Sequence, residues 1–101
     1  MKKSETKIGK VVERRSKELN KLCCEIIQAK GENPPGDVFE AATVIERFLQ
    51  TEGISYQTFE PAEGHVSVVA TVGSGKPLLI LCGHIDVVPA GDLSRWNIPP
   101  Y

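Results

Sequence analysis

Apolar residues recur at helical spacing over the first third of the chain. Between residues 8 and 29 they lie mostly three or four positions apart, which is the period of one face of an amphipathic helix. This stripe consists of Ile8, Val11, Val12, Leu19, Leu22, Cys23, Ile26 and Ile27. It is interrupted near Arg15 and Ser16, so we expect the helix to break there and its first turns to fray or stand apart.

A second helical stripe follows a loop with two prolines, residues 31–36, through which no helix can continue. Asp37 is the predicted N-cap of this helix, with Glu40 three residues later in the capping-box position and Gly53 at the end. The predicted buried stripe comprises Val38, Ala41, Ala42, Ile45, Phe48 and Leu49.

Beyond Gly53 the pattern changes from helical to extended. Residues 54–60 and 65–72 are rich in β-branched and aromatic side chains and predict two strands. The apolar run LLILC, residues 78–82, predicts a third strand that is buried on both faces of a helix-covered sheet. The five-residue turn at 73–77 favours an antiparallel hairpin between the last two strands. The order helix, helix, strand, strand, strand predicts the opening part of a mixed α/β sheet.

Composition excludes some functions. Twelve lysines and arginines against thirteen acidic residues give a net charge of −1, so charge does not favour nucleic acid or an anionic membrane as partner. The apolar runs fall far short of the ~20 residues of a membrane-spanning helix. The basic start Met1-Lys2-Lys3 is not followed by an apolar stretch, so we expect no secretory signal peptide and a cytoplasmic location.

The candidate chemistry lies directly after the third predicted strand, at His84 and Asp86. Side chains two positions apart in an extended segment point to the same side. A neutral imidazole can bind a metal through one nitrogen while a carboxylate accepts the proton of the other, which fixes the tautomer. Open α/β sheets bind ligands at this end of their strands. The alternative is a hydrogen-bonded pair that only caps a strand end.

The residues around His84 and Asp86 strengthen the prediction of a metal site. The segment GHIDVVPAGD at 83–92, followed by Trp96 and Pro99-Pro100-Tyr101, resembles the GHxDVVPxGD…W…PPF signature of a family of zinc deacylases and exopeptidases. That family contains acetylornithine deacetylase, succinyl-diaminopimelate desuccinylase, aminoacylase and glutamate carboxypeptidases. The stretch Asn33-Pro34-Pro35-Gly36 is similar to the turn between the family's first two helices. Tyr101 departs from the phenylalanine that is common at its position.

This resemblance implies an α/β metallohydrolase catalytic domain that cleaves N-acyl amino acids or peptides with metal-activated water. It makes His84 a ligand of one of two metal ions and Asp86 the catalytic carboxylate that orients this histidine. Zinc is the expected ion, with cobalt or manganese as alternatives. The family's other ligands and its general base follow the motif, so we expect residues 1–101 to be an incomplete N-terminal portion that is inactive alone. A homodimer is one assembly open to the full-length protein.

Other interpretations stay open. A barrel amidohydrolase also places ligands at a strand end, but its motif is His-x-His, whereas the second residue here is Asp86. A non-catalytic binding or regulatory role is the stronger alternative. The stretch Gly73-Ser74-Gly75-Lys76 lacks the spacing of a phosphate-binding loop and predicts a turn. His65 is predicted to be solvated, and Cys82 to be a dry, buried thiol and no ligand.

Overall fold

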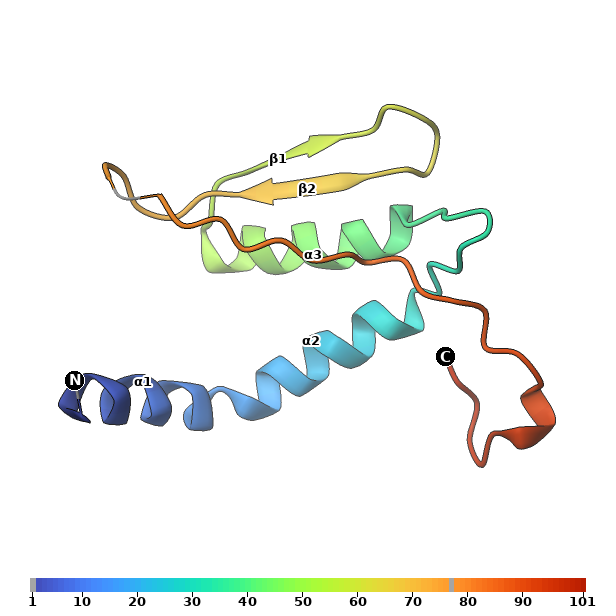
Figure 1. Ribbon diagram of the computed structural model, residues 1–101, viewed down its shortest axis with the longest axis horizontal. Coiled ribbons are helices and arrows are strands. Elements are labelled where there is room, and N and C mark those ends of the chain that lie inside the picture. The colour runs from blue at the N-terminus through green and yellow to red at the C-terminus, as the bar shows by residue number, and fades with distance from the viewer. Residues whose placement is uncertain (1, 77) are drawn as a thin grey trace.

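The computed structural model describes residues 2–76 and 78–101. Within them, the elements are the helices α1 (Lys2–Arg14), α2 (Ser16–Gln28) and α3 (Phe39–Glu52), the strands β1 (Tyr56–Phe59) and β2 (Ser67–Ala70), and a short 3-10 turn, Leu93–Arg95. Figure 1 shows α3 lying between the β1–β2 hairpin and α2, with α1 continuing α2 away from this body. The α/β class is therefore as predicted. In the part of the chain that the structure describes, no helix is long and apolar enough to cross a membrane.

The predicted break in the first helical stripe is confirmed at Arg15. This residue separates α1 from α2, with backbone angles φ −96° and ψ 7°. Its guanidinium donates hydrogen bonds to Glu18 in the next turn and to Glu52 at the end of α3. The junction between the first two helices is thereby tied to α3, whereas Ile8 and Val12 of α1 remain exposed.

The second helix begins later than predicted. Helix α3 begins at Phe39, and its N-cap position is taken by Val38, which makes no side-chain cap. The predicted N-cap, Asp37, lies one position earlier, where its Oδ1 accepts a hydrogen bond from the backbone N–H of Phe39 at 3.1 Å. Gly53 ends the helix as predicted, in the left-handed conformation (φ 68°) that a side chain disfavours.

The small core lies on the predicted stripe of α3. Val38, Ala41 and Ala42 form it with Val66, the residue before β2, and the side chains that pack against it are Ile26, Ala29, Val68 and Ile85. Leu49, further along the stripe, is also buried, whereas Ile45 and Phe48 are half-buried. The core therefore joins both helical layers to the hairpin and to the segment that carries the candidate site.

The first two predicted strands are confirmed, although both are shorter than predicted. β1 and β2 pair with each other in antiparallel register, with Tyr56 opposite Ala70 and Phe59 opposite Ser67. The predicted hairpin was between the second strand and residues 78–82, and that pairing is wrong for the residues that the structure describes. Pro77, in the predicted turn, lies outside the described residues.

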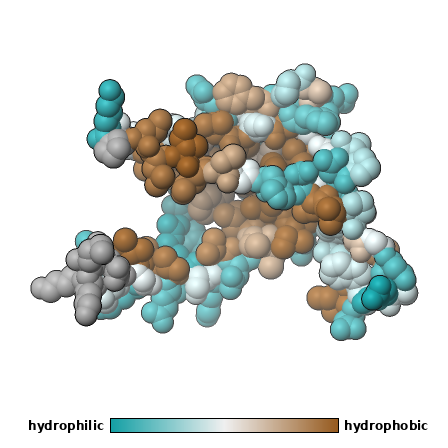
Figure 2. All heavy atoms as spheres, viewed as in Figure 1, coloured by the Kyte–Doolittle hydropathy of each residue, from teal (hydrophilic) through white to brown (hydrophobic). Residues whose placement is uncertain are grey.

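The predicted third strand is not formed. Residues 78–82 belong to no strand, and Leu78, Leu79, Ile80 and Leu81 are 77%, 80%, 76% and 87% exposed. Cys82 is exposed as well, so the expected buried thiol is also wrong. Burial on both faces needs paired neighbours and covering helices, and β2 is paired with β1 instead. Figure 2 shows hydrophobic side chains gathered on the surface where the chain leaves the hairpin.

Candidate functional site

His84 and Asp86 lie together, with the intervening Ile85 turned the other way. Nδ1 of His84 is 3.1 Å from Oδ1 of Asp86 and 2.9 Å from the backbone carbonyl oxygen of the same residue. Ile85 packs against the core, so the alternation that the sequence predicted is present. Both partners of Nδ1 are acceptors, so Nδ1 carries a proton, and in the neutral ring the lone pair of Nε2 is left for another ligand.

Asp86 is held on its other side by the loop that follows α2. The side-chain amide Nδ2 of Asn33 donates a hydrogen bond to Oδ2 of Asp86 at 3.0 Å. This bond is the main cause of a lowered pKa of Asp86, because it stabilises the ionised form; partial desolvation opposes the shift, and His84 adds a smaller contribution in the same direction. The Asp86 carboxylate is therefore charged at neutral pH and shared between Asn33 and His84.

The backbone of the same loop fixes the distance between these two segments. The N–H of Asn33 donates to the carbonyl of Val87, and the N–H of Val87 donates to the carbonyl of Gly31, each at 2.8 Å. They form an isolated parallel bridge between Glu32 and Val87. The site is thus built by two segments far apart in the sequence.

Gly31 permits this close approach. A Cβ atom at this position would lie 3.1 Å from Cγ1 of Val38 and 3.3 Å from the carbonyl oxygen of Ile85. Both distances are shorter than ordinary van der Waals contacts, and one of the atoms belongs to the backbone. Only glycine fits here without a shift of the loop or of the His84 segment.

The C-terminal residues of the chain also contact this loop. The Tyr101 hydroxyl donates a 2.6 Å hydrogen bond to Oε1 of Glu32, and Nζ of Lys30 lies 5.3 Å from the centre of the Tyr101 ring. The bond to the Glu32 carboxylate, helped by desolvation, raises the pKa of Tyr101. No pattern in the sequence predicted these contacts.

Two other residues near the motif, Asp92 and Trp96, have local structural roles. Oδ1 of Asp92 accepts hydrogen bonds from the backbone N–H of Ser94 at 3.0 Å and from its hydroxyl at 2.7 Å, which caps the 3-10 turn. Nε1 of Trp96 donates to the carbonyl of Ala90 at 3.0 Å and anchors the loop. His65 is exposed, as expected of a solvated histidine.

The pair offers a metal ion one ligand, the Nε2 atom of His84. His84 is 84% exposed at its side chain and Asp86 38%, so the imidazole is accessible while its carboxylate partner is partly enclosed. Among residues 2–76 and 78–101, no group of three or more histidine, cysteine, aspartate or glutamate side chains could hold a metal ion. A complete metal centre would therefore need ligands from outside the described residues.

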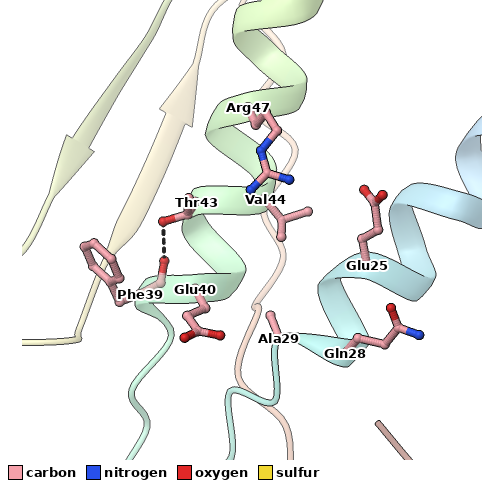
Figure 3. Close-up of a pocket in the computed structure, with 8 residues that line it drawn as sticks. All are labelled: Glu25, Gln28, Ala29, Phe39, Glu40, Thr43, Val44 and Arg47. Carbon is pink, nitrogen blue, oxygen red and sulfur yellow. Dashed lines mark hydrogen bonds between the residues drawn. The ribbon is translucent and has the colours of Figure 1, made fainter.

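A shallow pocket lies elsewhere, between α2 and α3. Figure 3 shows its lining side chains, with the Thr43 hydroxyl donating to the carbonyl of Phe39 at 2.9 Å. The lining residues are Glu25, Gln28, Ala29, Phe39, Glu40, Thr43, Val44 and Arg47. Neither His84 nor Asp86 lines it, so this pocket is separate from the candidate site.

The chain is similar to bacterial desuccinylases. It is 29% identical over 85 residues to a probable succinyl-diaminopimelate desuccinylase of Staphylococcus aureus, covering 84% of this chain and 21% of that protein. A relative of the same name from Staphylococcus epidermidis is 31% identical over 81 residues, or 80% of this chain and 20% of the relative. The succinyl-diaminopimelate desuccinylase of Herminiimonas arsenicoxydans is 41% identical over 53 residues, or 52% of this chain and 14% of that enzyme.

These relatives agree with the desuccinylase part of the resemblance seen in the sequence. The chain spans about a fifth of the length of the first two. No family model matches the chain, and no solved structure does.

Proposed function

We propose that this chain is an N-terminal portion of a desuccinylase-type, metal-dependent hydrolase that cleaves the amide bond of N-acyl amino acids or peptides. The observation that carries the proposal is the His84–Asp86 pair, in which the carboxylate holds the proton on Nδ1 and leaves Nε2 free. The pair lies in a chain whose relatives are named as desuccinylases.

In this proposal, His84 holds one of two metal ions through Nε2, and Asp86 orients the imidazole and increases its basicity. Bound at His84, zinc would supply a Lewis acid able to polarise the amide carbonyl and to lower the pKa of water toward neutrality. Cobalt or manganese would serve as well, because histidine and carboxylate ligands discriminate weakly among these ions. Asp86 keeps its role only while it is ionised, and the Asn33 hydrogen bond favours that form.

A non-catalytic binding role is the second candidate. It is favoured by the lack of any three-ligand group among the described residues and by the exposed apolar segment at 78–82, which offers a surface to a partner. The two candidates differ in what must follow residue 101: the hydrolase needs further acidic and histidine ligands and a general base, whereas the binding module needs none.

The test is hydrolysis by protein produced with whatever coding sequence follows residue 101. N-succinyl and N-acetyl amino acids serve as substrates, with zinc or cobalt added. We expect metal-dependent turnover that His84→Ala abolishes and that His65→Ala, a matched change at an exposed histidine, leaves intact. Turnover that survives His84→Ala would refute the metal-ligand role, and a stop codon directly after residue 101 would favour the binding module.

A further inference from the structure

We infer that Asn33 is a positioning residue for His84, acting through Asp86. This inference deepens the function proposed above and rests on it for the meaning of the His84 ring orientation. The contact itself is defined by geometry.

The two oxygens of Asp86 have different partners. Oδ1 lies 3.1 Å from Nδ1 of His84, and Oδ2 accepts the Asn33 amide at 3.0 Å. A carboxylate held by one partner alone can still rotate about its Cβ–Cγ bond. The second hydrogen bond, on the opposite oxygen, sets the plane of the carboxylate and so directs Oδ1 at the imidazole. Asn33 therefore controls the direction of the group that selects the His84 tautomer.

Asn33 is itself held by the main chain. Its backbone N–H donates to Val87, the residue next to Asp86, at 2.8 Å, so the amide is brought to the carboxylate by a bridge that does not depend on its own side chain. Gly36 leaves room for the amide: at its φ of +82°, a Cβ there would lie only 3.3 Å from Cγ of Asn33. The turn is closed by the Gly36 N–H, which donates to the carbonyl of Glu32 at 2.8 Å.

The chemistry of the amide is specific to this position. Only its NH₂ group can donate to a carboxylate, so the contact fixes which way the amide faces. Aspartate has the same shape but places a second carboxylate against Asp86, and alanine removes the donor altogether. Asn33→Asp and Asn33→Ala thus remove the hydrogen bond in two different ways, and both keep the backbone N–H that donates to Val87.

The experiment reads the tautomer of His84 directly. The imidazole ¹⁵N shifts of the metal-free, 101-residue chain distinguish the Nδ1–H form from the Nε2–H form. We expect the Nδ1–H form of His84 to predominate in the parent chain. Both Asn33 variants should lower its ratio to the Nε2–H form about threefold or more, which is near the lower end of the effect of losing one ordinary hydrogen bond. Asn97→Ala, a matched change in an exposed loop, should leave the ratio unchanged, and His65 is the internal reference.

Hydrogen exchange of the Val87 amide shows in the same samples whether the loop is still docked. An unchanged His84 ratio in both variants, with the Val87 amide still protected, would overturn the inference. Loss of Val87 protection in both variants would also overturn it, because Asn33 would then act by docking the loop and not on the imidazole. No metal is present at any stage, so a failure of the proposed hydrolase would show in the turnover experiment and not here.

Discussion

The Tyr101 hydroxyl donates a 2.6 Å hydrogen bond to the carboxylate of Glu32, which lies 69 positions earlier in the chain. Lys30 lies over the same ring, at 5.3 Å from its centre. These contacts connect the last residue of the sequence to the loop that carries Asn33. The contact between the C-terminal residues and this loop can therefore be monitored by titrating the Tyr101 hydroxyl.

We expect the pKa of Tyr101 to fall toward its ordinary value of about 10 in Glu32→Gln. The pKa is raised in the folded chain, so the stabilisation is fully present below the unfolded pKa and is lost as the pH rises through the folded one. A Tyr56→Phe background leaves Tyr101 as the only tyrosine, and tyrosinate absorbance reports its titration. Glu63→Gln, at an exposed glutamate, is the control. An identical titration in Glu32→Gln would show that the contact is absent in solution.

A second prediction concerns the close approach at Gly31. Gly31→Ala should destabilise the chain by about 1–3 kcal/mol, the usual cost of overpacking, because the new methyl group would meet Val38 and the Ile85 carbonyl. Gly9→Ala is the matched control: it has nothing within 4 Å and lies inside α1, so it should stabilise by roughly 0.5–1 kcal/mol. Urea denaturation measures both. Equal effects of the two substitutions would contradict the close packing around Gly31.

A third prediction concerns zinc. One imidazole and one carboxylate do not complete the four-coordinate shell of a typical zinc site. Calorimetry on the 101-residue chain should therefore show zinc binding no tighter than that of a short histidine peptide, and the chain should hydrolyse no N-acyl amino acid. Tight zinc binding that is lost in both His84→Ala and Asp86→Ala, but kept in His65→Ala, would mean that other ligands exist.

The exposed apolar segment leads to a fourth prediction. A large apolar side chain that stays in water lacks the ~1.5–3 kcal/mol of stabilisation that its burial would contribute. Four such side chains are more than three-quarters exposed in this segment: Leu78, Leu79, Ile80 and Leu81. We expect the 101-residue chain to self-associate through residues 78–82, as seen by light scattering during size-exclusion chromatography. Leu79→Glu combined with Leu81→Glu should reduce association, whereas Ser74→Glu should not. A monodisperse parent chain with strongly protected amides at 78–82 would refute this.

Local patterns in the sequence predicted local structure well. The helix break at Arg15, the end of α3 at Gly53 and the buried face of Val38, Ala41 and Ala42 follow from spacing and from glycine geometry. So does the His84–Asp86 pair, since alternation in an extended segment fixes which side chains share a side. Each of these features depends on residues only a few positions apart.

Features that depend on distant partners were not predictable. The run at 78–82 has the composition of a buried strand, but burial depends on what covers it, and that is not encoded in the run itself. The sequence pattern identifies Asn33 only as part of a turn, because its partner Asp86 lies 53 positions away and no periodicity links the two residues. The paired prolines and Gly36 mark a tight turn, and a polar residue before such a turn is the one local sign that could have suggested a contact.

The bridge between the Asn33 loop and the Val87 segment also has a consequence for the order of folding. Closing a chain segment of 53 residues costs about 3.5 kcal/mol of entropy, taken as (3/2)RT ln n. The helices and the β1–β2 hairpin form through contacts between nearby residues and bear a smaller cost. The geometry around His84 is therefore expected to assemble after the helices and the hairpin and to open before them, so ligand binding there would be coupled to closure of this 53-residue segment.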